Sequence, residues 1–366
     1  MKVLEITNVD FSLRQFLLPL MRGIRARGHE VIGVCAEGPL LEIVRAEGFR
    51  VAPMPFERSR SIAAQWRALR ALVALMRAEK PDLVHAHMPI SGFLARVAAR
   101  IAGVRRVAYT CHGFLFNQPS RWERRAASLL MEWIGGRLTD TYMTVSTEEA
   151  ADARRLLISR HAVAVGNGRD PARFHPDPAA RARLRAEFGT PPDRVVVAAI
   201  SRLVRHKGYP ELVLAMDGLD AELWVVGERL PSDRGEDMDA YFAASGLGGR
   251  LRRLGYREDI PAILAAADIF ALPSHFEGLP MSIIEAMLTG LPVVATDISG
   301  PREQVVHGAT GLLAPPMRVP ELAAALRQLA EDAGLRARMG AAGRARALEL
   351  YDEDRVVART LDLLGL

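Results

Sequence analysis

Long apolar runs, cysteines and glycine-rich nucleotide loops are all scarce in this sequence. No apolar run approaches the roughly 20 residues that a transmembrane helix needs, so the sequence predicts no membrane span. Only two cysteines, Cys35 and Cys111, occur in 366 residues, which argues against a disulfide framework and favours reduced thiols in a cytoplasmic protein. No Gly-x-Gly-x-x-Gly follows the first expected strand, Val3–Thr7, and this argues against a dinucleotide-dependent oxidoreductase.

Aromatic residues are also few, at 6% of the chain, and few of them lie near basic clusters. With no recognised DNA- or RNA-binding motif, no nucleic-acid partner is expected. The start of the chain becomes polar too quickly for a signal peptide. Residues 1–165 hold 24 basic and 15 acidic residues, whereas residues 166–366 hold 24 and 28. A basic first half predicts that an anionic surface faces it.

The chain alternates expected strands with expected helices, which predicts βαβ units and mainly parallel sheets in an α/β fold. At 366 residues, two domains are expected. The expected strands are Val3–Thr7, Glu30–Cys35, Arg50–Ala52, Leu83–Ala86, Arg106–Thr110, Thr141–Val145, Val195–Ile200, Glu222–Val226, Arg250–Leu254, Ile269–Leu272, Pro292–Ala295 and Gly311–Ala314. The expected helices include Phe16–Arg27 and Arg302–His307. A Gly- and Pro-rich hinge is expected at Val165–Pro178, and a last helix at Arg344–Leu364 has no strand after it.

Two glutamates eight residues apart, Glu277 and Glu285, are the most informative feature that is present. Glu277 is expected on the loop after the buried strand Ile269–Leu272, and Glu285 about one turn inside the next helix, Met281–Leu288. Open α/β sheets bind ligands at this edge. The unpaired amides of the helix start suit a phosphate, and a carboxylate beside them suits sugar hydroxyls.

Four segments together resemble the retaining glycosyltransferases of the GT4 type, in the family's order and over nearly the whole chain. They are Thr110–Gly113, Gly166–Phe174, Ser201–Gly208 and His275–Ala286. The resemblance implies a GT-B fold, with two Rossmann-like domains facing each other across a cleft and a C-terminal helix that crosses back to the first domain. The expected domains are residues 1–168 on the acceptor side and 169–345 for the nucleotide sugar, with a crossover helix at 346–366.

By the same resemblance, the second domain binds the donor. Arg202 and Lys207 would hold the diphosphate, Glu277 would contact the donor sugar or support its reacting face, and Glu285 would bind the ribose. Arginine and lysine can stabilise a departing diphosphate without a metal, so no metal and no cofactor are expected. Four further residues complete the expected donor site: Gly278, Leu279, Pro280 and Arg257.

In the first domain, the resemblance places His112 near the donor sugar, in a catalytic set with Arg202, Lys207 and Glu277. Many family members carry a Gly-Gly loop after the first strand, and this chain has Asn8–Arg14 there. We therefore assign Ser12 and Arg14, together with His87, to the acceptor side.

Two metal-like patterns in the sequence are interpreted without a metal. His85 and His87 have no third ligand in the sequence pattern. The string Asp237-Met238-Asp239 is interpreted as a solvated loop or the start of a helix.

The expected activity is retaining transfer of a hexose or N-acetylhexosamine from a UDP- or GDP-linked sugar to a glycan or lipid-linked acceptor in cell-surface polysaccharide biosynthesis. Two basic, tryptophan-bearing stretches further predict peripheral contact with an anionic membrane surface on its inner face. The first contains Arg58, Arg60, Trp66, Arg67 and Arg70, and the second contains Arg121, Trp122, Arg124, Arg125 and Trp133.

Other activities remain open. Two carboxylates 5–10 Å apart also serve glycosidases, although a neutral glycoside needs no diphosphate clamp. A nucleotide-sugar 2-epimerase of the same fold would act on the donor without an acceptor. A non-catalytic sugar-nucleotide-binding subunit would have no need of the full charged set. A glycan phosphorylase would need a pyridoxal-phosphate lysine, for which the sequence gives no context.

Overall fold

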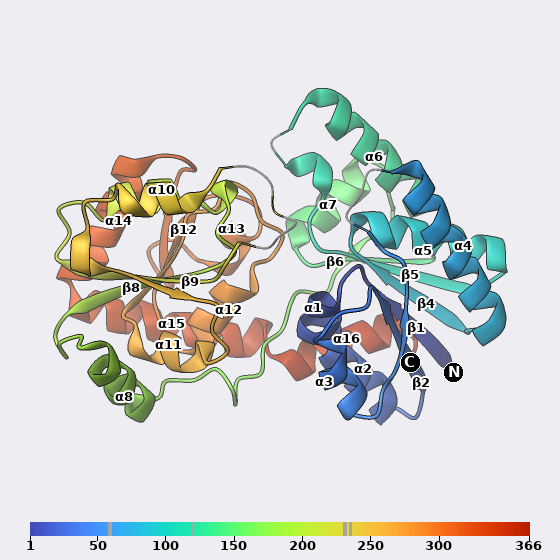
Figure 1. The fold of residues 1–366 in the computed structure, drawn as a ribbon, viewed down its shortest axis with the longest axis horizontal. Helices are drawn as coiled ribbons and strands as arrows, with labels where there is room; N and C mark the ends of the chain where they lie inside the picture. The colour runs from blue at the N-terminus through green and yellow to red at the C-terminus, as the bar shows by residue number, and fades with distance from the viewer. Residues whose placement is uncertain (58–60, 119, 230–232, 234–235) are drawn as a thin grey trace. The chain divides into compact units, whose positions relative to one another are not determined.

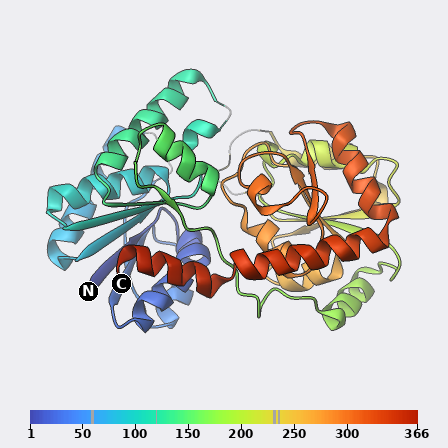
Figure 2. The same ribbon diagram turned by 180° about the vertical axis from the view of Figure 1, so that it is seen from behind.

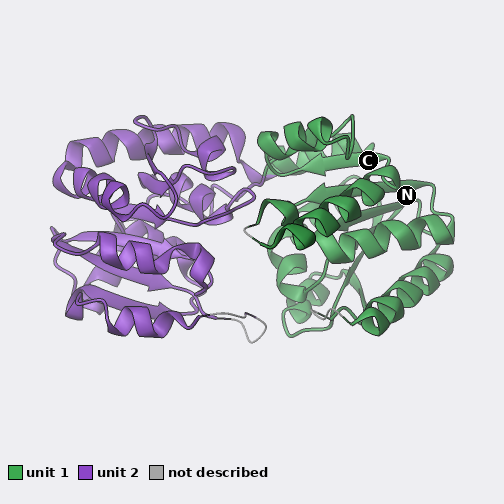
Figure 3. Cartoon of the chain, turned by 90° about the horizontal axis from the view of Figure 1, so that it is seen from above, with its two compact units in different colours: residues 1–166, 354–366 green, residues 167–353 purple. Residues whose placement is uncertain are grey.

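The fold is described from a computed structural model, which describes residues 1–57, 61–118, 120–229, 233 and 236–366 (Figure 1). It divides into two compact units, coloured separately in Figure 3. Unit 1 comprises residues 1–166 and 354–366, and unit 2 comprises residues 167–353. The chain thus changes unit after residues 166 and 353, where the sequence analysis placed boundaries after 168 and 345.

Unit 1 contains a sheet of seven parallel strands in the order β3-β2-β1-β4-β5-β6-β7. Consecutive strands run outward from β1 in one direction and from β4 in the other, so the strand order reverses between these two neighbours. Ligands bind at such switch points in open α/β sheets. The strands are β1 Lys2–Ile6, β2 Glu30–Cys35, β3 Arg50–Pro53, β4 Leu83–His87, β5 Arg106–Cys111, β6 Thr141–Thr144 and β7 Val163–Ala164.

Helices cover both faces of this sheet (Figure 1). Because side chains alternate along a strand, Leu4 and Ile6 pack with α4 and α5, whereas Val3 packs with α2 and α3. Helix α4 shows why the segment is helical: Ser61 caps its start, and Ala64, Ala68, Leu72 and Met76 are buried at four-residue spacing. The helices are α1 Asp10–Ser12, α2 Leu18–Ala26, α3 Leu41–Ala46, α4 Ile62–Glu79, α5 Pro89–Ala102, α6 Trp122–Arg137 and α7 Thr147–Arg155.

The C-terminal helix α16, Glu353–Leu364, packs within unit 1 (Figure 2). Its Leu361 and Leu364 join the core on the α2 face, and Gly23 of α2 makes room for it, since a Cβ there would lie 2.5 Å from Val357 Cγ1. The prediction of one helix at Arg344–Leu364 is wrong, because α15 ends at Leu350 and α16 starts at Glu353. Between them the backbone pairs with Arg169 instead, through Arg169 N–H to Tyr351 O and Glu353 N–H to Arg169 O.

Unit 2 has a sheet of six parallel strands in the order β10-β9-β8-β11-β12-β13, with its switch point between β8 and β11. The strands are β8 Val195–Ile200, β9 Ala221–Val226, β10 Leu251–Gly255, β11 Ile269–Leu272, β12 Val293–Thr296 and β13 Gly311–Ala314. The helices are α8 Pro178–Phe188, α9 Tyr209–Ala215, α10 Met238–Ala243, α11 Ile260–Ala266, α12 Met281–Leu288, α13 Pro301–Gln304, α14 Val319–Glu331 and α15 Ala333–Leu350.

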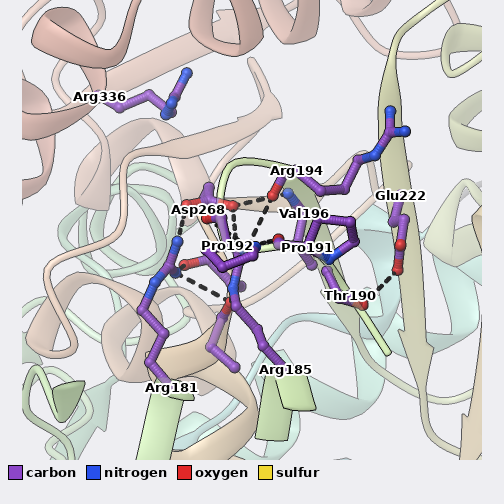
Figure 4. A network of polar contacts seen from close by, with 12 residues as sticks. Arg181, Arg185, Thr190, Pro191, Pro192, Arg194, Val196, Glu222, Asp268 and Arg336 are labelled. Atoms are coloured by element: carbon purple, nitrogen blue, oxygen red, sulfur yellow. Dashed lines mark hydrogen bonds and ion pairs between the residues drawn. The ribbon is translucent and has the colours of Figure 1, made fainter. Parts of the chain in front are cut away.

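A buried arginine closes the amino edge of the unit 2 sheet (Figure 4). Arg185 of α8 donates to the carbonyl oxygens of Ala266, Pro191 and Arg194, and to Asp268 Oδ2 at 2.5 Å. Asp268, just before β11, also accepts the amide of Val196 in β8. The network therefore ties α8 to the starts of the two central strands.

Other expected elements differ in extent from the structure. The expected helix Phe16–Arg27 begins earlier, as α1 followed by a π-helical segment at Leu13–Leu17 and then α2. The expected helix Arg302–His307 is only the short α13. Asp237 caps the start of α10 through the amide of Asp239, which confirms the prediction of a helix start there.

Candidate functional site

Two loops meet at the carboxyl edge of the unit 2 sheet, one after β8 and one after β11. Gly208, at φ +77°, brings them together, because a Cβ there would lie 2.0 Å from the carbonyl oxygen of Pro273. His275 N–H donates to His206 O at 2.8 Å, and the His206 ring stacks on Phe276 with centroids 4.6 Å apart. Burial, and then the charges of Lys207 and Arg202, lower the pKa of His206 to about 4. It is therefore a neutral stacking group at pH 7.

This packing brings Lys207 and Glu277 into direct contact. Lys207 Nζ donates to Glu277 Oε1 at 2.6 Å, and the two side chains are only 15% and 10% exposed. The predicted phosphate-binding lysine and the first glutamate of the spaced pair thus share one spot at the switch point. Arg202, in the same loop after β8, pairs with Asp233 and is more exposed.

The second glutamate has a partner of its own. Glu285 lies in α12 and accepts a hydrogen bond from Arg169 Nε at 2.7 Å. Arg169 belongs to the segment that bonds to Tyr351 and Glu353. The carboxylate expected to bind a ribose is therefore tied to the place where the chain passes between units.

The Gly278-Leu279-Pro280 turn between the two glutamates is held from three sides. Asn167 Nδ2 donates to Leu279 O at 2.7 Å, and Gln304 Nε2 donates to Pro280 O at 2.9 Å. Gly300, at φ +87°, permits the third contact, since a Cβ there would lie 1.8 Å from Gly278 O. No side chain of the described residues caps the start of α12, so its first amides remain available to an anion.

Unit 1 places a buried polar cluster at its own switch point. Glu5 on β1 contacts His85 Nδ1 at 3.0 Å and His87 Nε2 at 2.9 Å, both from β4. His85 Nε2 contacts Thr110 Oγ1 at 2.8 Å, and His87 Nδ1 contacts His112 Nε2 at 3.1 Å. The structure thus brings two predicted residues, His87 and His112, into direct contact, and it places Glu5, which was not predicted from the sequence, against the other nitrogen of His87.

Burial and charge set the protonation of this cluster. Burial alone would raise the pKa of Glu5, but His85 and then His87 outweigh it and lower the pKa to about 2. Burial, followed by the charge of His85, lowers the pKa of His87 to about 4. Burial and the charges of His87 and His85 hold the pKa of His112 well below its usual range. At neutral pH, Glu5 is therefore ionised, and His87 and His112 are neutral.

The distances also make Glu5 a third group beside His85 and His87, with possible ligand atoms within 4.8 Å of one another. The two histidines have no third ligand in the sequence pattern, whereas the structure places one candidate, Glu5, beside them. The hydrogen bonds to Glu5, Thr110 and His112 nevertheless account for all four ring nitrogens of His85 and His87.

The two other acceptor-side residues lie in the segment after β1. Ser12 is buried at the end of α1, and its hydroxyl donates to Asn8 Oδ1 at 3.4 Å. Arg14 lies in the π-helical turn, a conformation often found at functional sites.

Comparison with known proteins agrees with this arrangement. The model "Glycosyl transferases group 1" matches residues 180–346, and "Glycosyl transferase 4-like domain" matches residues 13–168. A 2-deoxystreptamine glucosyltransferase of Streptomyces kanamyceticus is 32% identical over 77% of this chain and 78% of its own length.

The chain belongs to the group 1 glycosyl transferases.

A second relative of this glycosyl transferase is the UDP-Gal:alpha-D-GlcNAc-diphosphoundecaprenol alpha-1,3-galactosyltransferase of Escherichia coli. It is 31% identical over 66% of this chain and 65% of its own length. Among solved structures, Anabaena HepE in complex with UDP and glucose matches with a TM-score of 0.82, at 23% identity over 100% of this chain and 99% of that one. These matches confirm the GT-B fold and the family resemblance.

One residue of the predicted donor set lies apart from the others. Arg257 follows β10, and its guanidinium pairs with Asp259 at 2.8 and 2.6 Å and lies over the ring of Phe188. None of these contacts joins it to Lys207 or Glu277.

The sequence analysis missed several residues of this glycosyl transferase that shape the site, among them Arg169, Asn167 and Gln304. Asn167 and Arg169 stood in the segment already singled out, so their polar side chains beside a glycine were the available signal. Gln304 carried no such signal.

Proposed function

We propose that this protein is a retaining glycosyltransferase that moves a hexose or N-acetylhexosamine from a UDP- or GDP-linked sugar to a glycan or lipid-linked acceptor. The observation that carries the proposal is the Lys207–Glu277 pair, which joins the phosphate-type loop and the glutamate loop at the switch point of unit 2. The enzyme would serve cell-surface polysaccharide biosynthesis.

The charged groups suit a donor that leaves as a nucleoside diphosphate. On binding, the diphosphate would draw Lys207 away from Glu277, with Arg202 and the first amides of α12 as further donors. Glu277 would then be released to a sugar hydroxyl, and Glu285, paired with Arg169, would bind the ribose. Because these groups supply the positive charge, we propose that transfer needs no divalent metal.

We infer retention from the family resemblance and propose a front-face mechanism for it. The bond between the anomeric carbon and the diphosphate oxygen breaks, and the acceptor oxygen bonds to that carbon on the same face. The acceptor proton passes to the departing phosphate oxygen. No side chain has to act as a nucleophile, so His112 and Glu277 support the reaction by hydrogen bonding.

A lipid-linked acceptor agrees with an unusual outer surface of unit 1. The outer stripe of α6 exposes Trp122, Leu130, Trp133 and Ile134 beside several arginines. Near the start of α4, Ile62 and Trp66 are 86% and 60% exposed. We propose that these surfaces contact an anionic membrane. Of the basic residues predicted for this contact, Arg58 and Arg60 lie outside the described residues.

Among the described residues, no helix has both the length and the apolar character that crossing a bilayer requires.

The test is a transfer assay with UDP- and GDP-sugars and a polyprenyl-diphosphate-linked sugar as acceptor, with and without EDTA. We expect transfer that survives EDTA, with the donor's anomeric configuration retained in the product by NMR. An inverted product or loss of activity in EDTA would contradict the mechanism. Conversion of the donor without an acceptor would favour the 2-epimerase, and binding of the donor without any turnover would favour the non-catalytic subunit.

A further inference from the structure

A continuous line of hydrogen bonds links the buried carboxylate of Glu5 to His112. Glu5 Oε2 contacts His87 Nε2 at 2.9 Å, and His87 Nδ1 contacts His112 Nε2 at 3.1 Å. Glu5 and His87 sit on neighbouring central strands, β1 and β4, and are 0% and 2% exposed. Strand register fixes Glu5 and His87, so the inner part of the line belongs to the sheet, whereas His112 lies just after the end of β5.

Counting protons along this line leaves one consistent arrangement. An ionised carboxylate only accepts, so His87 must donate to it through Nε2–H. A neutral imidazole has a single N–H, so His87 Nδ1 carries a lone pair and accepts from His112 Nε2–H. His112 is also neutral, which leaves a lone pair on its Nδ1. The low pKa values of Glu5 and His87, about 2 and about 4, agree with these charge states at pH 7.

The outer end of the line is open. His112 is only partly buried, and the described residues provide no hydrogen-bond partner for its Nδ1. Phe16 packs against the His112 ring with centroids 5.9 Å apart.

We propose that Glu5 and His87 are positioning residues that hold His112 as the Nε2–H tautomer, so that its Nδ1 accepts a hydrogen bond from a hydroxyl group of the bound sugar substrate. The hydrogen bond from a sugar hydroxyl rests on the proposed function, whereas the tautomer of His112 is argued from contacts within unit 1 alone. The relay also lets the negative charge of Glu5 act on His112 through His87, which strengthens Nδ1 as an acceptor.

His85 contacts the same carboxylate as His87 but is not hydrogen-bonded to His112 in the described structure, so its hydrogen bonds provide a control. It contacts the other carboxylate oxygen of Glu5 through Nδ1 and Thr110 through Nε2. Thr110→Val therefore perturbs the same buried cluster, whereas His87→Gln keeps a donor toward Glu5 and breaks the link to His112.

The first test is long-range ¹H–¹⁵N NMR of the ligand-free full chain labelled at histidine, with signals assigned by single histidine substitutions. We expect the proton of His87 and of His112 on Nε2 at neutral pH. In His87→Gln we expect the His112 signals to average between tautomers, whereas Thr110→Val leaves them unchanged. A proton on His87 Nδ1, tautomer averaging of His112 in the wild type, or stoichiometric bound zinc on the ring nitrogens would overturn the proposal.

The second test uses the transfer assay on the same variants. His87→Gln and Glu5→Gln should each lower kcat at least tenfold with little change in the donor KM, and Thr110→Val should stay within twofold of wild type. If the histidine tautomers are as expected but the protein transfers no sugar, the proposed function is refuted and the tautomer assignment stands. If the wild-type enzyme is active but the His112 tautomers average, the positioning role of Glu5 and His87 is refuted and the proposed function stands.

Discussion

The two sheets place different chemistry at equivalent edges. In unit 2, the groups at the switch point are charged pairs on loops and on a helix, Lys207–Glu277 and Arg169–Glu285. In unit 1, they are one carboxylate and a set of imidazoles, with Glu5, His85 and His87 on the strands themselves. Both sheets are parallel and both reverse their order at this point.

The difference shows what each edge can do. Charged side chains on loops can exchange a protein partner for a ligand, which suits a diphosphate that arrives and leaves. Groups fixed by strand register hold one protonation pattern, which suits the steady presentation of a hydrogen-bond acceptor. The same fold thus provides an edge in unit 2 where charged side chains can exchange partners (the exchangeable edge). In unit 1 it provides an edge where strand register holds the polar groups in place (the fixed edge).

The largest expected effect comes from removing the exchangeable cation. Lys207→Ala should lower the transfer rate by about 10²–10³-fold, the range seen when one charge-stabilising donor is lost from a transition state. Steady-state assays of the variant measure this. Arg194→Ala is the matched control, because it removes a cation paired with Asp220 at the opposite edge of the same sheet. Equal losses in the two variants would show that the edge has no special role.

At the amino edge of the unit 2 sheet, the Arg185–Asp268 pair is buried and structural, in contrast to the Lys207–Glu277 pair. Asp268→Ala leaves the buried guanidinium of Arg185 without its carboxylate and should lower the free energy of unfolding by about 3–5 kcal/mol. Urea unfolding followed by circular dichroism measures the change. Glu321→Ala, which removes an exposed pair with Arg318, should lower the free energy of unfolding far less. Similar costs in both variants would contradict the distinction.

Acid should weaken the fixed edge of unit 1 in two stages. The pKa of His87 is lowered from 6.5 to about 4, so the unfolded chain binds more protons and stability falls as pH drops from about 6.5 to 4. The pKa of Glu5 is lowered from 4.5 to about 2, so its contribution is lost as pH falls from about 4.5 to 2.

The contribution of His87 to the stage above pH 4 corresponds to up to about 3 kcal/mol, so the loss of stability in this range should be smaller in His87→Gln. His112 and His206, whose pKa values burial also lowers, account for what remains. Denaturant midpoints measured at several pH values test this. An unchanged pH dependence in the variant would show that His87 does not set it.

The smallest expected effect concerns the outer surface of α6. Trp122→Ser with Trp133→Ser should weaken binding to vesicles with anionic lipid by about tenfold, which corresponds to 1.4 kcal/mol. Leu214→Ser, an exposed apolar residue on α9 in unit 2, is the control. Flotation that does not depend on anionic lipid, or an equal loss in the control, would refute the membrane proposal.

Periodic apolar segments predicted the two parallel sheets, and the spaced glutamates with the basic loop predicted the family. Helices α7 and α8 were missed because their sequences are dominated by charged residues and alanine and carry only a weak apolar period. The break between α15 and α16 was missed because it depends on hydrogen bonds with Arg169, which lies some 180 residues earlier. Glu5 was missed because a single acidic residue in a strand acquires its partners only through β1–β4 pairing.

We propose that the carboxyl edge of unit 2 binds a nucleoside diphosphate, which replaces Glu277 as the partner of Lys207. Isothermal titration calorimetry with UDP and GDP in EDTA, on wild type, Lys207→Ala and Arg194→Ala, tests it directly. We predict binding of one of the two nucleotides without metal, at least tenfold weaker in Lys207→Ala and unchanged in Arg194→Ala. No binding to the wild type, or equal binding to wild type and Lys207→Ala, would contradict the account.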